Sequence, residues 1–174
     1  WNIKRKGLKF ITKSASGPHS IDRSIPLGTL LKEIMKYAAT TWEIKKILNS
    51  NYVKVDGKVR RSHKFPVGIF DTIEFTNINE NFRIVLNKKD KLSVIKIGEE
   101  EVHLKPCKII NKTMVKGKLQ INLFDGKNIF VDKNSYKVGG TIILSLPEQE
   151  INKYLKLDKK STILLIGGKH VGEI

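Results

Sequence analysis

The sequence predicts an α+β fold that is rich in β-strands, and three patterns support this prediction. Residues 24–50 contain two segments with apolar residues at helical spacing. An Asp-Gly pair follows them, flanked by short alternating runs as in a β-hairpin. From residue 70 onward, short apolar stretches alternate with polar turns, as in a small β-barrel or sandwich. The 174 residues, 40% of them apolar, suffice for one ordinary domain or two to three small ones.

Residues 24–50 are predicted to form two helices. In the first, Pro26 suits the opening turn, where its missing N–H would be unpaired in any case. The residues expected to face inward on this helix are Leu27, Leu30, Leu31, Ile34 and Ala38. Thr40 and Glu43 then have the spacing of a capping box, which predicts the start of a second helix.

The second helix is expected to have one apolar and one basic side. Its inward-facing residues are expected to be Ile44, Ile47 and Leu48. Trp42, Lys45 and Lys46 remain on the outer side, where a tryptophan beside lysines can stack on a base or a ribose. The same ring could instead fold back onto the hydrophobic core, and the sequence leaves both positions open.

The segment after the second helix has the pattern of a β-hairpin. Val53 and Val55 alternate with Lys54, and Asp56-Gly57 supplies the tight turn because glycine accepts positive φ at no steric cost. Basic side chains crowd the next stretch, at Lys58, Arg60, Arg61, His63 and Lys64. A charge run is usually a solvated surface, but its place beside a hairpin turn and a basic helix favours RNA contact here.

Beyond residue 70 the pattern predicts mainly strands. The predicted strands are residues 71–78, 81–87, 91–98, 104–110, 112–117, 119–124, 128–132 and 141–146. Glu99–Glu101 are expected in a solvated turn or a helix start. Residues 148–155 are expected to form a short helix, and residues 161–166 one further strand before a Gly-Gly turn.

The charge of the chain favours a polyanionic partner. There are 33 Lys and Arg against 17 Asp and Glu, a net charge of +16, and residues 1–70 hold +11 of it. Such a surplus repels itself in the compact state, and its concentration in the first 70 residues predicts a nucleic-acid-binding surface there. A membrane partner is disfavoured, because no apolar run approaches the ~20 residues that span a bilayer, and residues 1–11 do not have the pattern of a secretory signal.

No catalytic or metal-binding pattern stands out, so we expect no catalytic residues, no metal and no cofactor. The four histidines lack metal-ligand spacing, and neither a phosphate-binding loop nor a dinucleotide fingerprint is present. The single cysteine, Cys107, rules out an intramolecular disulfide and is expected to be a small core residue in a reducing compartment. These patterns predict a cytoplasmic, non-enzymatic protein.

Several segments, in order along the chain, together resemble one family. TTWEIKKILNSNYVKVDG (40–57) with FPVGIFDTIEF (65–75) resembles the alpha-L RNA-binding motif. GPHSIDRSIPL (17–27), HKFPVG (63–68), LQINLFDGKNI (119–129), LSLPEQEI (144–151) and GGKHVG (167–172) extend the resemblance to the archaeal and eukaryotic e-type small-subunit ribosomal protein four. The resemblance covers essentially the whole chain.

The resemblance implies an architecture of four parts. These are a basic N-terminal extension (1–23), a small helical alpha-L RNA-binding domain (24–70), a central β-barrel-like domain (71–146) and the start of a C-terminal KOW module with an SH3-like fold (147–174). Family members have a more basic lead-in and continue beyond GGKHVG, so we expect a fragment with a truncated KOW module.

The resemblance also implies a role as a structural constituent of the small ribosomal subunit. Its partners would be small-subunit ribosomal RNA and neighbouring ribosomal proteins, with no small-molecule substrate, and the chain would be monomeric outside the ribosome. The candidate RNA-binding residues are Lys4, Arg5, Lys6, Lys9, Lys36, Trp42, Lys45, Lys46, Lys54, Lys58, Arg60, Arg61, His63, Lys64 and Lys169. Related alpha-L motifs have an arginine near the start of the second helix, where this chain has Thr41 and Trp42, so stacking by Trp42 would replace a phosphate contact.

Two alternatives remain at this point. The chain could be the RNA-binding part of an RNA-modifying enzyme, although no segment resembles the catalytic aspartate motif of the pseudouridine synthases. It could also be a KOW-type transcription or translation factor that binds protein partners.

Overall fold

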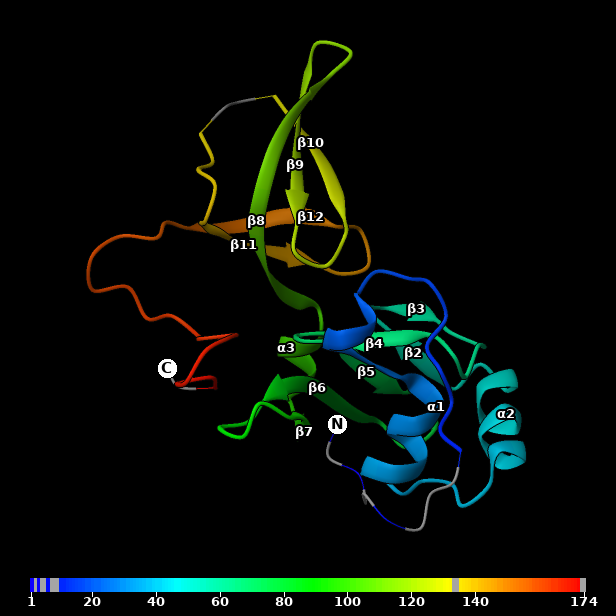
Figure 1. Ribbon diagram of the computed structural model, residues 1–174. Helices are drawn as coiled ribbons and strands as arrows, with labels where there is room; N and C mark the ends of the chain where they lie inside the picture. Colours follow the sequence, from blue (N-terminus) through cyan, green and yellow to red (C-terminus); the bar gives the residue numbers. More distant parts are fainter. Residues whose placement is uncertain (2, 4–5, 7–9, 133–134, 173–174) are drawn as a thin grey trace.

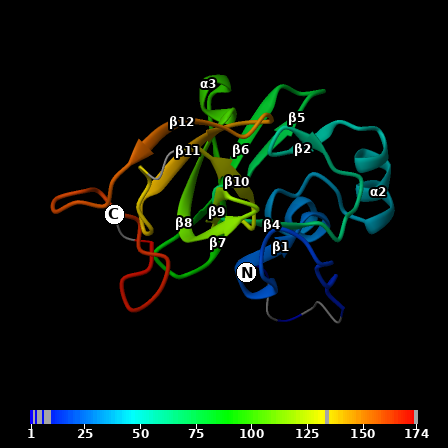
Figure 2. The same ribbon diagram turned by 90° about the horizontal axis from the view of Figure 1, so that it is seen from above.

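Antiparallel strands dominate the computed structural model, which describes all residues except 2, 4–5, 7–9, 133–134 and 173–174 (Figure 1). They form two five-stranded sheets and one two-stranded ribbon, and the helices are few and short. The predicted β-rich fold is therefore confirmed. The second helix and residues 156–172 lie on opposite sides of the molecule (Figures 1 and 2).

The first predicted helix is shorter and wider than its sequence pattern suggests. The single turn η1 (Ile21–Arg23) and the strand β1 (Ser24–Pro26) come first. The helix itself consists of the α-turn α1 (Leu27–Thr29) and the π-helical η2 (Leu30–Ile34). Pro26 lies directly before the first helical turn and not in it: it is the N-cap of α1 and also ends β1, which pairs with β4 (Pro66–Gly68). The amide of Met35 donates to the carbonyl of Leu30, and the helix stops before Lys36, whose φ is +58°. The apolar spacing is nevertheless used, because Leu27, Leu30 and Leu31 are fully buried.

The second helix and the hairpin agree with the sequence. α2 (Thr41–Asn49) begins with the predicted capping box between Thr40 and Glu43. β2 (Val53–Val55) and β3 (Lys58–Val59) then pair around Asp56 and Gly57, whose φ values of +53° and +71° give the tight turn.

The first large sheet has the strand order β3-β2-β5-β6-β7. Its remaining strands are β5 (Thr72–Phe75), β6 (Glu80–Leu86) and β7 (Leu92–Lys96). The helices pack against it, and their shared core consists of residues between Ile25 and Leu92. The hairpin thus belongs to the same sheet as the three strands that follow it.

The second large sheet has the order β10-β9-β8-β11-β12. After the short helix α3 (Glu99–Val102), its strands are β8 (Leu104–Val115), β9 (Lys118–Leu123), β10 (Asn128–Val131), β11 (Thr141–Ser145) and β12 (Glu150–Leu155). β8 is one strand where two were predicted, since a bulge between Ile109 and Asn111 resets its register without ending it. Its separate core runs from Cys107 to Leu144.

The helix predicted over residues 148–155 is wrong, because this segment contains β12. Ile151 and Tyr154 are three residues apart, as on a helix face, yet both pack against the second core. A bulge in the β11–β12 pairing explains this: Leu144 faces Ile151 and Ile142 faces Tyr154, so one residue between them drops out of register.

The strand predicted over residues 161–166 is also wrong, because these residues pair with no strand in the described part of the chain. Ile166 packs against the first core, whereas Ile163 and Leu165 remain exposed. Alternation alone does not make a strand where no neighbour supplies hydrogen bonds.

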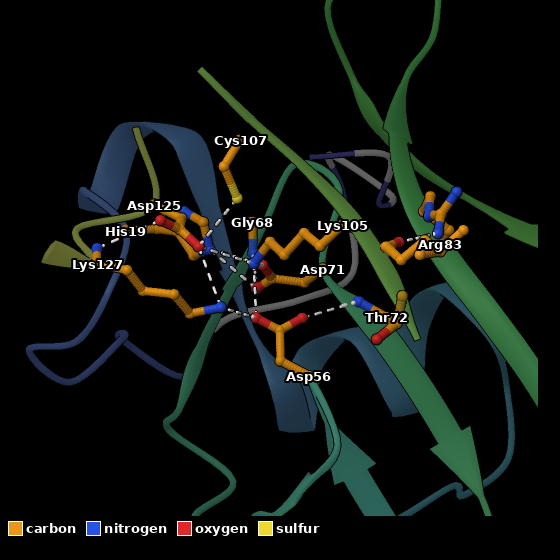
Figure 3. Close-up of polar contacts among 11 residues, drawn as sticks. His19, Asp56, Gly68, Asp71, Thr72, Arg83, Lys105, Cys107, Asp125 and Lys127 are labelled. Atoms are coloured by element: carbon orange, nitrogen blue, oxygen red, sulfur yellow. Dashed lines mark hydrogen bonds and ion pairs between the residues drawn. The ribbon is translucent and has the colours of Figure 1, made fainter. Parts of the chain in front are cut away.

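A buried ion cluster joins the two large sheets (Figure 3). The ammonium of Lys105, on β8, lies 2.6 Å from Asp56, 2.5 Å from Asp71 and 3.3 Å from Asp125. Lys127 adds contacts of 2.9 Å to Asp56 and 3.1 Å to Asp125. The three carboxylates belong to three different turns, so one buried lysine holds turns of both sheets together.

The N-terminal arm enters the same junction. The imidazole Nε2 of His19 lies 2.9 Å from both carboxylate oxygens of Asp71. Gly68 must be a glycine here, because a Cβ atom would lie 2.5 Å from that ring. A Cβ on Gly126 would similarly lie 2.9 Å from the carbonyl oxygen of Pro18. Pro18 and His19 are therefore packed at the junction of the two sheets.

Charges in the cluster shift one another's pKa values. Burial alone would raise the pKa of Asp71, but Lys105 and His19 outweigh it and hold this pKa well below its usual range. Burial likewise opposes the charge on Lys105, yet its three carboxylate neighbours raise its pKa well above the usual value. Asp71 and Lys105 are therefore both ionised at neutral pH.

Replacing the central lysine should destabilise the fold strongly. Lys105→Met leaves buried carboxylates without their cation, which typically costs about 3–5 kcal/mol in the free energy of unfolding. Urea denaturation at pH 7 measures this loss. Lys108→Met on the same strand is the matched control, because Lys108 is exposed and should change stability by less than about 0.5 kcal/mol. Equal losses for the two variants would contradict the structural role of Lys105.

Acid should weaken the fold through the same cluster. Because the pKa of Asp71 is lowered in the folded state, its contribution to stability is complete above the ordinary carboxyl pKa of 3.8 and is lost as the pH falls below it. Urea denaturation between pH 7 and pH 2.5 should therefore show a steep loss of stability in the acid range. Asp71→Asn should be less stable at pH 7 and have a shallower acid slope; an unchanged slope would contradict this assignment.

Candidate nucleic-acid interface

The outer surface of α2 presents an aromatic ring among lysines. The capping box fixes the start of the helix, and Ile44 and Leu48 are buried beneath it. Trp42 is 70% exposed, so its ring does not fold back onto the core. The ammonium of Lys46, one turn further on, lies 5.5 Å from the centroid of this ring. A flat, solvent-exposed π surface next to a cation suits stacking on a nucleobase.

The acid on this helix is already engaged. Oε2 of Glu43 accepts hydrogen bonds from the main-chain amides of Ala39 at 2.8 Å and Thr40 at 3.3 Å. These hydrogen bonds lower the pKa of Glu43, so its charge is held at the start of the helix. The outer surface of α2 therefore remains positive.

The loop after the hairpin lies beside α2. The imidazole of His63 is close enough to Lys45 and Lys64 for their charges to lower its pKa, after the larger effect of its burial. The carbonyl of His63 accepts a hydrogen bond from the amide of Gly28 at 2.8 Å, which fixes the loop on α1. Lys45, Lys46, His63 and Lys64, together with Trp42, are called the α2 surface below.

The two arginines of this loop have different surroundings. Arg60 is partly buried, with its guanidinium 4.3 Å from the centroid of the Phe65 ring, so it supports the loop structurally. Arg61 is exposed, and its Nε donates to the side-chain oxygen of Asn51 at 2.9 Å, just beyond α2. Arg61 is therefore oriented beside the α2 surface, while substitution of Arg60 would disturb the fold as well.

The other described candidates lie on segments other than α2 and the loop at residues 63–64. Lys54 lies opposite Glu74 in the sheet register, so a carboxylate neighbours its charge. Lys36 is exposed after η2, and Lys58 is exposed on β3. Lys6 and Lys169 are exposed as well. The candidates Lys4, Arg5 and Lys9 lie outside the described residues.

Part of the basic arm packs beside this surface. The amide of Ala15 donates to the carbonyl of Lys64 at 2.9 Å. A pocket between the arm and the first helices is lined by Phe10, Ile11, Thr12, Gly28, Thr29, Lys32, Glu33, Thr41, Ile44 and His63. From residue 10 onward, the basic N-terminal extension thus lies on its own chain.

The described residues contain no group of three or more metal-ligating side chains and no helix that could span a membrane. Cys107 is buried as expected, and burial together with Asp125 raises the pKa of its thiol. Its neighbour Lys105 is committed to the ion cluster, so the thiol is inert core material.

Sequence reasoning missed one basic surface, on β8, β9 and β10. It carries the exposed ring of Phe130, flanked in the chain by Ile129 and Val131, which pack against the core. Period-two alternation could have assigned Phe130 to the outer face.

Comparison with known proteins places the chain in the class of ribosomal proteins. A sequence profile described as Ribosomal family S4e matches residues 78–151. A protein named small ribosomal subunit protein eS4 from Caldivirga maquilingensis is 41% identical over 99% of this chain and 74% of its own length. Its counterpart from Methanothermobacter thermautotrophicus is 40% identical over 100% of this chain and 72% of its own length.

The chain belongs to the eS4 family of small ribosomal subunit proteins. A crystal structure of the 30S ribosomal protein S4e from Thermoplasma acidophilum has the same fold, with a TM-score of 0.72 and 29% identity, covering 87% of this chain and 77% of that one. This confirms the family resemblance and the prediction of a structural protein rather than an enzyme. The comparisons support neither the RNA-modifying enzyme nor the KOW-type transcription or translation factor.

The pKa of His63 reports the positive charge of the α2 surface. We expect His63 to titrate below the ordinary value of 6.5, because burial and the two lysines disfavour its charged form. In an NMR titration, with the signal assigned by its loss in His63→Gln, Lys45→Ala should raise this pKa. Lys46→Ala should leave it nearly unchanged. A pKa at or above 6.5 in the unaltered protein would contradict the arrangement.

Proposed function

We propose that this protein is a structural constituent of the small ribosomal subunit and binds its ribosomal RNA through the α2 surface and the basic N-terminal arm. The observation that carries the proposal is the exposed Trp42 beside Lys46, on a helix whose only carboxylate caps the helix start. Relatives that are about 40% identical over this chain are named small ribosomal subunit proteins, which supports the ribosomal part of the proposal. A place in the small subunit agrees with the predicted cytoplasmic location.

Each side chain of the α2 surface would have a distinct task. The lysines would contact phosphates, which supply most of the affinity of such interfaces without reading sequence. Trp42 would stack on an unpaired base or ribose, in the place of the arginine found in related motifs. Arg61, held by Asn51, is positioned to extend the phosphate contacts past the end of α2.

The finer architecture is part of the same proposal. Residues 24–70 would be the alpha-L RNA-binding domain, which the capped α2 and the Asp-Gly hairpin support. Residues 71–146 would form the central β-rich domain, of which β5–β7 share a sheet and a core with residues 24–70. Residues 147–174 would be the start of a KOW module. The pairing of β12 with β11 bears on the last boundary, because it would attach the start of the module to the central sheet.

The partners would be small-subunit ribosomal RNA and neighbouring ribosomal proteins. Outside the ribosome the chain would be a monomer. No cofactor enters the proposed role, because phosphate contacts and stacking require only side chains.

Charge reversal on α2 tests the RNA-binding surface. In titrations with small-subunit ribosomal RNA, log K should fall linearly with log salt between roughly 50 and 200 mM, by about 0.7 to 0.9 per phosphate contact. Lys45→Glu with Lys46→Glu should weaken binding roughly tenfold or more and make the slope shallower by about two contacts' worth. Both side chains are exposed, so the fold should be kept.

Lys159→Glu with Lys160→Glu is the matched control, because it reverses two exposed charges far along the chain. It should change affinity much less. Equal losses for the two double variants would place the binding surface elsewhere, and binding that did not weaken with salt would contradict the mechanism.

A further inference from the structure

The outer face of β8, β9 and β10 has an unusual composition. Directly opposite residues on neighbouring strands share a face, and Ile121 and Ile129 face the core. The alternate residues therefore face outward. They form a row of Asn111, Asn122 and Asn128 and a row of Thr113, Gln120 and Phe130.

Phe130 is the aromatic residue of this face. Its side chain is 56% exposed, although it lies in a strand and its neighbours Ile129 and Val131 are packed. Because this ring lies on the sheet surface and not in the core, its π face is open to solvent. It stands beside Gln120, whose side-chain amide donates to Asn122 at 2.9 Å.

The hairpin region has a large excess of positive over negative charge. Residues 104–131 contain six lysines and a single acid, Asp125. Asp125 forms ion pairs with Lys105 and Lys127 in the buried ion cluster. Lys108, Lys116 and Lys118 are exposed, and Asp132, just after β10, is the next acid along the chain.

The shape of the hairpin makes these lysines accessible. β8 and β9 project beyond the rest of the molecule at the top of Figure 1, well away from α2. Their last pair, Val115 with Lys118, extends past the end of the β9–β10 pairing, which stops at Leu119. Lys116 and Gly117, with φ values of +49° and +77°, make the tight turn at the tip.

We propose that this outer face is a second RNA-binding surface, which takes an unpaired strand with a base stacked on Phe130. The inference rests on the proposed function, since it assigns a further site for the same class of ligand. Lys108, Lys116 and Lys118 contact the phosphates on either side of the stacked base. The asparagine and glutamine amides, which can both donate and accept, face the hydrogen-bonding edges of the bases.

The composition of the face selects RNA over an acidic protein segment. Lysines alone would attract either polyanion. An exposed ring beside two rows of amides, however, matches a ligand that offers flat bases with polar edges. Unpaired rather than duplex RNA is the ligand, because only unstacked bases can lie on an aromatic side chain.

Binding of a labelled, unpaired RNA of about 12 nucleotides tests this site, because such a length fills a single-strand binding surface. The full chain is used with Lys45→Glu and Lys46→Glu in place, so that the α2 surface contributes little. Phe130→Ala in this background should weaken binding roughly 5- to 150-fold, the usual loss for one stacked base. Leu157→Ala is the matched control, since Leu157 is 60% exposed in the C-terminal segment, and it should leave affinity unchanged.

Two further substitutions separate stacking from folding. Phe130→Leu keeps an apolar side chain but lacks a π face, and it should bind as weakly as Phe130→Ala. Phe130→Trp should keep the affinity, and added RNA should quench its fluorescence more than that of the parent variant, which already contains Trp1 and Trp42. Affinity for Phe130→Leu equal to that of Phe130, or no more quenching in Phe130→Trp than in the parent variant, would overturn the inference.

The outcomes distinguish this inference from the proposed function. If the unaltered chain binds ribosomal RNA and Phe130→Ala has no effect, the second surface is wrong while the α2 surface stands. If the unaltered chain binds no RNA, both fail. Competition by polyglutamate as strong as by RNA at equal charge would show a general polyanion site and overturn the assignment to RNA.

Discussion

The ammonium of Lys105 among three carboxylates is the interaction on which the rest of the structure depends. It is 1% exposed and contacts Asp56 in the hairpin turn, Asp71 before β5 and Asp125 in the β9–β10 turn. Hydrophobic burial holds each of the two cores together, but the two cores are separate. The buried charges give the junction between them one arrangement, because any displacement would leave a charge without its partner away from water.

This junction also sets where the proposed RNA-binding surfaces point. The Asp56 turn belongs to the hairpin that follows α2, and Lys105 lies near the start of β8, whose far end is the β8–β9 tip. The N-terminal arm is fixed to the same point through His19. Two basic surfaces in different parts of the molecule are thus attached to one rigid centre, as binding a folded RNA at two places would require (Figures 1 and 3).

Local signals in the sequence were sufficient for the elements nearest the proposed site. The Thr40–Glu43 capping box and the Asp-Gly turn depend on residues a few positions apart, and both are present. The bulges were not predictable in the same way. In β12 a bulge gives Ile151 and Tyr154 a helical spacing within a strand.

The ion cluster was beyond the reach of pattern reasoning, because its members are distant in sequence. Lys105 is 49 residues from Asp56 and 34 from Asp71, and nothing local distinguishes it from the lysines around it. Arg60 shows the same limit: the basic run predicted RNA contact, and only the packing shows that this arginine also stacks on Phe65. The number of charges located the basic region. Only the packing distinguished the basic side chains that support the fold from those that are exposed to solvent.

Photo-crosslinking within assembled small subunits tests the central claim most directly. A photoreactive residue in place of Trp42 should crosslink to small-subunit ribosomal RNA, since the α2 surface is proposed to lie on that RNA. The same residue in place of Leu157, which is also exposed, serves for comparison. Crosslinks from position 42 to protein alone, with RNA crosslinks from position 157, would contradict the account.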